Sequence, residues 1–117
     1  MIARLWHGRT LAKDGDAYEA YIVETGVKAQ RACPGNLLSA ILRQDDGSET
    51  RFTVLSLWES WDAVRDFAGE YVETAVYYPE DTKYLLALEP TVAHWDVPAW
   101  AADPCWAPPL LRREGAS

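Results

Sequence analysis

Cysteine is scarce in this sequence, whose 117 residues contain only Cys33 and Cys105. The two stand far apart, and neither has a second cysteine at the spacing of a metal-binding motif. We therefore expect two free thiols in a reducing compartment, and no metal site. A disulfide between them would tie the C-terminal residues to the loop after the first helix, but nothing in the sequence requires it.

Positive charge is scarce as well. Eleven Lys and Arg against eighteen Asp and Glu give a net charge of −7, which argues against nucleic acid or an anionic membrane surface as a partner. No apolar run approaches the roughly 18 to 20 residues that a membrane span needs, and the first residues lack the pattern of a signal peptide. We expect a cytoplasmic protein, and the length suits a single domain.

The usual signatures of cofactor and nucleophile chemistry are also missing. The sequence contains no glycine-rich phosphate loop, no recognisable Ser-His-Asp arrangement and no cluster of metal-ligating side chains. Flavin or nicotinamide would have to bind without a known signature. The sequence therefore favours a protein that uses no cofactor.

The clearest pattern that is present lies in residues 51–67, RFTVLSLWESWDAVRDF, where a two-residue hydrophobic period changes to a helical one. One face of the expected strand carries Phe52, Val54, Ser56 and Trp58, and the other carries Thr53, Leu55, Leu57 and Glu59. Because both faces are mostly apolar, this strand should be central in its sheet and covered on both sides. Ser60 then caps a helix that runs to about Ala68 and ends at Gly69.

The other elements follow from weaker patterns. They are strands at 2–10, 37–43 and 91–97, a hairpin turn at 45–48 and a short helical piece at 72–78. The first helix begins at Asp14 or Asp16, and Asp16 with Glu19 has the spacing of a capping box. The order strand, helix, strand, strand, helix, strand predicts an α+β, ferredoxin-like βαββαβ fold in residues 1–97, with one antiparallel sheet and helices on one face.

Two parts of the chain need a partner in this fold. The second sheet face, which includes Leu55 and Leu57, is too apolar to remain in water, so we expect a homodimer that packs sheet against sheet. Residues 98–117 are rich in proline and contain Trp100 and Trp106. We expect this C-terminal extension to pack on the domain or on the other subunit.

The first helix presents an unusual stripe to the sheet. Its members at helical spacing are Tyr18, Tyr21, Ile22, Thr25 and Ala29. Two phenols and a hydroxyl on an inward face either find partners in the core or line a partly polar cavity. The stripe therefore leaves open a packing role and a ligand-binding role.

At the level of motifs, the sequence resembles the antibiotic biosynthesis monooxygenase family of dimeric α+β barrels. The resemblance rests on Ile2-Ala3-Arg4-Leu5-Trp6-His7-Gly8, Pro34-Gly35-Asn36, Leu57-Trp58-Glu59-Ser60, Phe67-Ala68-Gly69, Tyr77-Tyr78-Pro79-Glu80-Asp81 and the strand after Glu89-Pro90. It covers residues 1 to about 97. The family's superfamily includes cofactor-independent oxygenases of aromatic polyketides, haem-degrading enzymes and isomerases, so the resemblance implies the fold more firmly than the reaction.

The resemblance also implies roles for particular residues. In the quinone-forming oxygenases a strand-end Trp followed by Glu-Ser lies in the cavity between sheet and helices, and Trp58 matches it. The haem-degrading branch has an Asn on the first strand and a His after the second helix. In this sequence His7 stands where the Asn would be, and the position of the His lies near Tyr77. The missing His argues against haem ligation.

From these patterns we predict the following candidate residues. The catalytic candidates are Trp58, His7 and Tyr77, and the substrate-binding candidates are Tyr18, Tyr21, Tyr78, Arg4, Trp6 and His94. Histidine is the residue type with a reference pKa near neutrality, which makes His7 a candidate general base. Arg4 offers a cation to an enolate or phenolate, and each candidate also has an ordinary packing or ion-pair interpretation.

The function that these residues favour is a cofactor-independent monooxygenase that oxidises a small phenol-like or anthrone-like aromatic substrate with O2. The alternative is a non-oxidative ligand-binding or cyclase-type protein on the same scaffold. Haem degradation is the third hypothesis.

Overall fold

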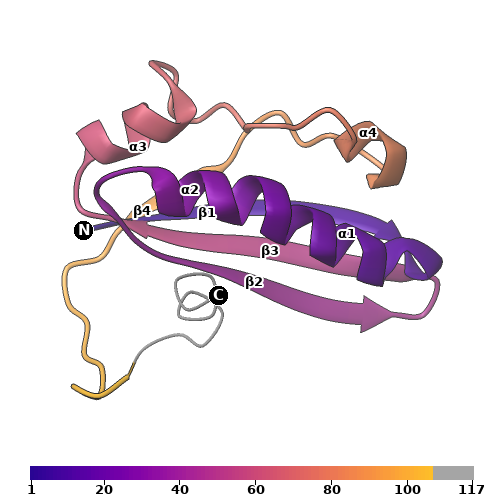
Figure 1. Ribbon diagram of the computed structural model, residues 1–117, viewed down its shortest axis with the longest axis horizontal. Coiled ribbons are helices and arrows are strands. Elements are labelled where there is room, and N and C mark those ends of the chain that lie inside the picture. Colours follow the sequence, from indigo (N-terminus) through magenta and orange to yellow (C-terminus); the bar gives the residue numbers. More distant parts are fainter. Residues whose placement is uncertain (107–117) are drawn as a thin grey trace.

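A computed structural model describes residues 1–106 of the chain and contains one four-stranded antiparallel sheet (Figure 1). Its strands are β1 (Ile2–Leu11), β2 (Asn36–Asp46), β3 (Glu49–Trp58) and β4 (Ala93–Asp96), in the spatial order β2-β3-β1-β4. With the helices between β1 and β2 and between β3 and β4, this is the predicted ferredoxin-like fold. Strand β4 is shorter than the expected 91–97.

Strand β3 is central, as its two apolar faces predict. Phe52, Val54, Ser56 and Trp58 are buried beneath the helices, and Leu55 and Leu57 are half-buried on the other face. The strand pairs with β1 from Ile2↔Trp58 to Leu11↔Glu49. The hairpin to β2 turns at Gly47, whose φ of 62° suits the two-residue turn.

The first helical segment contains a π-helical turn that its sequence pattern does not reveal. It consists of a 3-10 turn (Ala12–Asp14), α1 (Gly15–Ile22), the π-helical Val23–Val27 and α2 (Lys28–Ala32). The Thr25 hydroxyl donates to the Tyr21 carbonyl at 2.7 Å, where the regular helix would place the Thr25 amide. The extra residue in this turn moves the inward stripe from Ala29 to Val27 and Gln30, which are buried.

The predicted capping box at the start of this segment is wrong. The residue that caps α1 is Asp14, and it makes no side-chain capping bond. Asp16 and Glu19 instead accept hydrogen bonds from Arg43 Nη1 at 2.8 and 3.0 Å. The Arg43 guanidinium therefore takes the place of the backbone amides as the partner of the two acids, and the ion pairs join the helix to β2.

Helix α3 (Trp61–Ala68) begins and ends as predicted. Ser60 Oγ accepts from the Ala63 amide at 3.2 Å, and Gly69 ends the helix with a φ of 88°. The inward side chains Ala63 and Val64 are buried against Trp58 and Ile2. The helix thereby covers the end of β3.

The helical piece expected at 72–78 does not form, so that prediction is wrong. Long-range hydrogen bonds use its backbone: the Ala75 amide donates to Pro90 O at 3.0 Å, the Val92 amide donates to Glu73 O at 2.8 Å, and Thr74 bridges Thr91. A single turn, α4 (Asp81–Tyr84), follows Pro79 instead. Tertiary pairing therefore overrides the local helical pattern.

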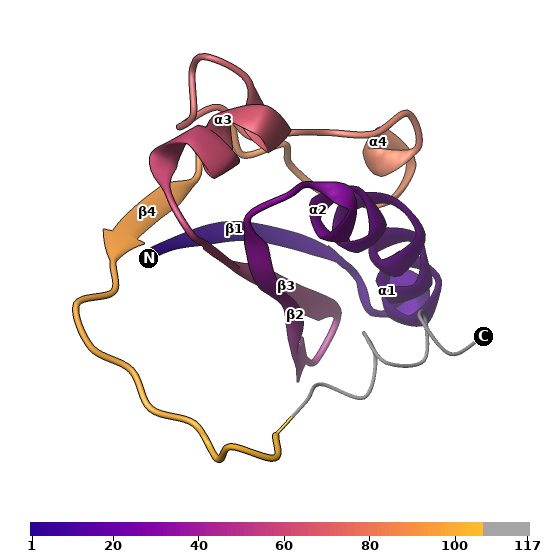
Figure 2. The ribbon, with the colours of Figure 1, turned by 60° about the vertical axis from the view of Figure 1, so that its left-hand side comes forward.

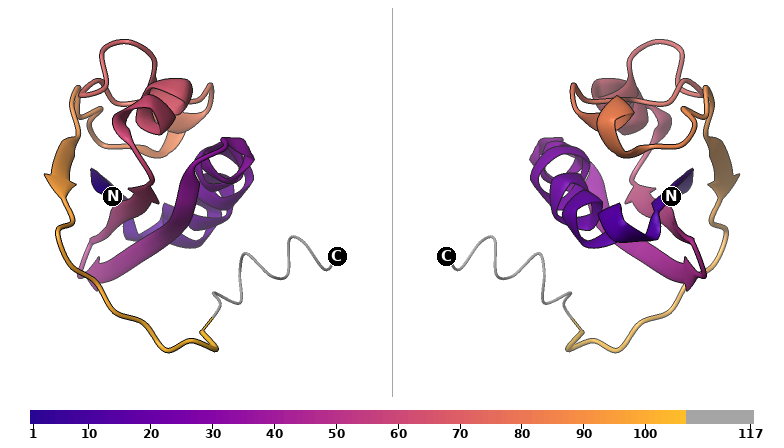
Figure 3. Two further views of the ribbon diagram at one scale, coloured as in Figure 1. Left: turned by 90° about the vertical axis from the view of Figure 1, so that its left-hand side faces the viewer. Right: turned by 90° about the vertical axis from the view of Figure 1, so that its right-hand side faces the viewer.

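The helices of residues 1–106 all lie on one face of the sheet, as Figures 2 and 3 show. On the opposite face Leu42 and Trp95 are 50% and 63% exposed. Described residues 98–106 run away from the domain on that side and are exposed, Trp100 and Trp106 included (Figure 2). The rest of the expected C-terminal extension, 107–117, lies outside the described residues, and no helix of residues 1–106 is long and apolar enough to cross a membrane.

Candidate active site

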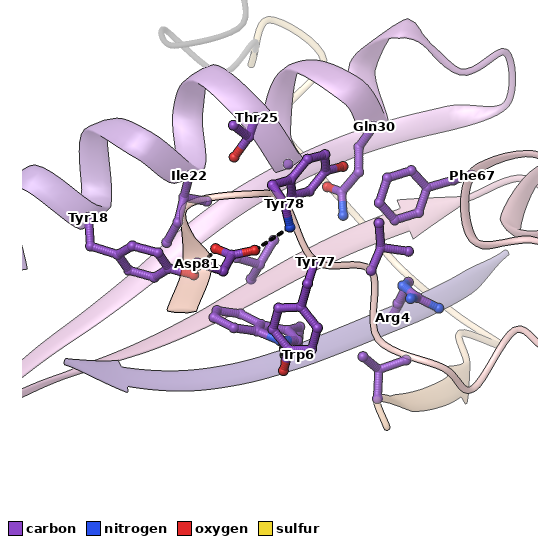
Figure 4. A pocket seen from close by; sticks show the side chains of 14 residues that line it. Arg4, Trp6, Tyr18, Ile22, Thr25, Gln30, Phe67, Tyr77, Tyr78 and Asp81 are labelled. Atoms are coloured by element: carbon purple, nitrogen blue, oxygen red, sulfur yellow. Dashed lines mark hydrogen bonds between the residues drawn. The ribbon is translucent and has the colours of Figure 1, made fainter. Parts of the chain in front are cut away.

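A small cavity lies between the first helical segment, the sheet and residues 76–81 (Figure 4). Its volume is about 50 Å³. An engineered cavity that binds benzene measures about 150 Å³, so an aromatic ring can enter only when the lining moves. Val76, Tyr77 and Tyr78 belong to no helix or strand, so within the lining their displacement breaks no helix or ladder hydrogen bond.

Arg4 gives this cavity a buried positive charge. The residue is 3% exposed, and its Nη2 donates to Thr74 O at 3.1 Å while Nη1 donates to Val72 O. The guanidinium lies 5.6 Å from the centre of the Phe67 ring. Burial lowers the pKa of Arg4 to about 10, so it is still charged at neutral pH. Within residues 1–106 no carboxylate forms an ion pair with it.

His94, one strand away, orients this arginine. Arg4 Nη1 lies 3.1 Å from His94 Nε2, so this nitrogen accepts and the proton belongs on Nδ1. Burial and the nearby charge of Arg4 lower the pKa of His94 and keep the ring neutral. The Trp61 ring packs against it in an edge-to-face arrangement, with ring centroids 5.1 Å apart. His94 is therefore behind Arg4 and does not line the cavity.

The other end of the cavity contains a buried carboxylate that sequence reasoning missed. Asp81 is 4% exposed, Oδ1 accepts from the Tyr18 hydroxyl at 2.8 Å, and Oδ2 accepts from the Tyr78 amide. Burial and the bond to Asp81 raise the pKa of Tyr18, which remains protonated. The sequence feature that could have identified Asp81 is its position two residues after Pro79. Proline often precedes or begins a helix, and acidic residues are common in the first turn.

Aromatic side chains form the walls between these two ends. Trp6 Nε1 donates to Tyr77 Oη at 3.2 Å, and the Tyr77 hydroxyl donates in turn to Glu89 O. Tyr78 lines the cavity with Tyr77, and burial raises the pKa of both. Tyr21 lies outside the lining, where its hydroxyl accepts from the Glu80 amide at 2.9 Å.

The position of the Trp6 ring depends on a glycine. A Cβ atom added at Gly8 would lie 2.3 Å from Trp6 Cη2 and 3.0 Å from Leu85 Cδ2. The indole therefore lies along β1 in the space that a side chain at residue 8 would occupy. Gly8 is needed here for close approach and not for an unusual φ.

Trp58 is a core residue in this arrangement. It is fully buried, its Nε1 donates to Ser56 Oγ at 2.9 Å, and its ring stacks on Phe67 with centroids 5.6 Å apart. Phe67 lines the cavity and Trp58 does not. Trp58 therefore supports the site through its contact with Phe67.

His7 lies on the opposite face of the sheet. It is exposed, and its Nδ1 is 2.9 Å from Thr53 Oγ1. It borders a separate groove of about 590 Å³ together with Leu42 and Arg51. Of the predicted site residues, the cavity thus brings together Arg4, Trp6, Tyr18, Tyr77 and Tyr78, and it does not include Trp58, His7, Tyr21 or His94.

Fold and cavity together define a ferredoxin-like α+β domain with a small, partly open cavity between its sheet and its helices. No family model and no curated protein sequence matches the chain. The solved structures that are similar include a putative antibiotic biosynthesis monooxygenase from Nitrosomonas europaea, with 13% identity over 85% of this chain and 100% of that chain and a TM-score of 0.59.

The haem degrader MhuD is also similar. The structure from Mycobacterium tuberculosis with two haems in its active site has 20% identity, covers 87% of this chain and 100% of its own, and has a TM-score of 0.57. A point mutant of MhuD with two manganese protoporphyrins per active site has 19% identity, 88% and 100% coverage and a TM-score of 0.58. These neighbours confirm the antibiotic biosynthesis monooxygenase resemblance at the level of the fold.

Haem ligation does not fit the residues of this chain. It has two histidines, of which His94 accepts from Arg4 and His7 lies on the far face of the sheet. We therefore derive no chemistry through haem.

Proposed function

We propose that this protein is a cofactor-independent monooxygenase that oxidises a phenolic or anthrone-like aromatic substrate with O2. The observation that carries the proposal is the buried charge of Arg4 beside an aromatic-walled cavity, without a carboxylate partner among residues 1–106. A buried cation in a site of low dielectric stabilises a developing oxyanion. A phenol that binds there becomes more acidic, and its anion is the form that reacts with O2.

The reaction balances without a cofactor. The substrate loses a proton to bulk water as it binds beside Arg4, and the resulting phenolate or enolate passes one electron to O2. The resulting radical and superoxide combine to form a carbon–oxygen bond, and protonation gives a hydroperoxide. Loss of water from the hydroperoxide leaves a carbonyl group, so one oxygen atom enters the quinone product and the other leaves as water.

The chain's residues contribute binding and electrostatics to this chemistry. Arg4 holds the anion, the phenol of Tyr78 offers a hydrogen bond, and Trp6 with Phe67 excludes water. Trp58 has a positioning role, because it supports the Phe67 ring. The sequence-predicted base His7 is on the other face of the sheet, so proton abstraction in this cavity is not assigned to it.

Oxygen uptake tests the proposal. Purified protein freed of metal and flavin is given a panel of anthrones and naphthols, and dissolved O2 and quinone absorbance are followed. We expect uptake that falls about a hundredfold in Arg4→Gln, the cost of losing an oxyanion donor. The matched control is Arg9→Gln, which removes a half-exposed arginine paired with Glu49. No uptake by folded protein, or equal uptake by both variants, rejects the proposal.

A non-oxidative binding or cyclase role is the second candidate. Among residues 1–106 the cavity lining contains no histidine and no other residue type whose ordinary pKa is near neutrality. The lining therefore offers no evident general base, which favours a non-oxidative role. Tight binding of an aromatic ligand without oxygen consumption would support this role.

We also propose that the protein is a homodimer formed through the uncovered sheet face. Leu5, Leu55, Leu42 and Trp95 lie on that face and are partly or largely exposed. Light scattering should give twice the mass of the chain, and Leu55→Lys should give the monomer. A monomeric wild type at micromolar concentration contradicts this arrangement. Deleting residues 98–117 tests whether the extension contributes to the dimer.

A further inference from the structure

Asp81 is a second buried charge in the cavity that the proposed oxidation does not use. The carboxylate has two oxygens with about four acceptor positions, and the Tyr18 hydroxyl and Tyr78 amide occupy one on each oxygen. Within residues 1–106 no basic side chain forms an ion pair with Asp81. Burying an ionised carboxylate without a cation is costly, so its unused acceptor positions need a reason.

The Tyr18 hydroxyl has a fixed direction at this end of the cavity. Its proton points to Asp81 Oδ1, at 2.8 Å, so the lone pairs of the same oxygen are left to accept. Asp81 and Tyr18 together therefore offer acceptors, and no donor, to a ligand. Arg4 by contrast offers only donors, since guanidinium has no acceptor.

The two ends lie on opposite sides of the Tyr77–Tyr78 pair, as Figure 4 shows. Trp6 and Tyr77 line the space between them, and Phe67 lies beside Arg4. The cavity therefore joins a cationic donor end to an anionic acceptor end through an aromatic middle. A flat ring system with complementary groups at its two ends matches this polarity.

We infer that the ligand of this site is a hydroxylated aromatic anion, whose ionised oxygen lies against Arg4 and whose separate hydroxyl group donates to Asp81 and Tyr18. The inference rests on the proposed function in that it concerns the same cavity, but it is about recognition and not about oxidation. It makes Asp81 a specificity-determining residue, because a ring without the hydroxyl leaves the buried carboxylate with unused acceptor positions.

Three related probes test this inference by calorimetry under nitrogen. The first is a naphthoate with a hydroxyl on the ring opposite the carboxylate, the second is its methyl ether, and the third is the unsubstituted naphthoate. We expect the hydroxynaphthoate to bind wild type about tenfold more tightly than the other two, the value of one hydrogen bond to a charged group. The methyl ether keeps the shape and loses the donor.

Variants then locate the preference. Asp81→Asn and Tyr18→Phe should each remove most of the tenfold difference, and Arg4→Gln should weaken all three probes by a similar factor. Equal binding of the three probes to wild type, absence of binding, or an unchanged preference in both Asp81→Asn and Tyr18→Phe overturns the inference. The wild-type comparison decides even where a variant does not fold. Because oxygen is absent, failure of the proposed oxidation would appear only in the uptake assay.

Discussion

Replacing Trp58 by Phe should strongly destabilise the fold, and the size of the loss can be worked out from its contacts. Truncating a buried Trp to Ala costs about 3 to 5 kcal/mol, and Phe keeps the six-membered ring, so packing accounts for roughly 1.5 kcal/mol. The lost indole N–H leaves Ser56 Oγ, which is fully buried, without its donor, at a cost of about 1 to 3 kcal/mol. We expect the free energy of unfolding to fall by about 3 kcal/mol in total.

Urea unfolding followed by circular dichroism measures this change, with all proteins at one concentration because a dimer's midpoint depends on it. The matched control is Trp61→Phe. Because Trp61 is 38% exposed, this variant should lose less than about 1 kcal/mol of the free energy of unfolding. Ser56→Ala in the Trp58→Phe background should cost about 1 kcal/mol less than in wild type, because it removes the orphaned hydroxyl. Equal losses for Trp58→Phe and Trp61→Phe would refute the reasoning.

Four other substitutions and a change of pH test the structure further. Ser60→Ala should lower the free energy of unfolding by about 1 kcal/mol in urea titrations through loss of the α3 cap, and no loss would contradict the cap. Gly69→Ala should cost about 1 to 3 kcal/mol from backbone strain alone, whereas Gly35→Ala should cost more, because its Cβ would also lie 2.6 Å from Ala63 Cβ. Stability should fall as pH drops below about 6.5, because the lowered pKa of His94 means that the unfolded chain binds more protons there, and thermal melts of His94→Gln should show a smaller fall.

The sheet and α3 were predictable because their signals are local. The alternation from Phe52 to Trp58, the Ser60 cap and Gly69 each express a rule that neighbouring residues satisfy by themselves. The existence of the first helix was predictable, but the residues that face the sheet after its π-helical turn were not. The Thr25 hydroxyl displaces one backbone bond and rotates everything after it, and no hydrophobic period records such a turn.

Part of the site was predictable from strand alternation, and Tyr18 was predictable from the helical stripe. Arg4 and Trp6 share a face of β1, so both were expected to point the same way, and both line the cavity. His7 has the opposite parity and therefore faces away from it. The position of Asp81 depends on the path of residues 70–80. Long-range hydrogen bonds to Arg4, to Pro90 and to the residues just before β4 determine that path.

The close approach of Trp6 to Gly8 makes the width of the cavity adjustable from outside its lining. Gly8 is not a lining residue, yet a single methyl group there would occupy the space of the indole and push the ring toward Tyr77 or out of the cavity. The substrate range of such a protein could therefore shift through one codon change that touches no substrate atom. Across natural variants, the size of the substrate ring that the protein accepts should change together with the side-chain volume at position 8.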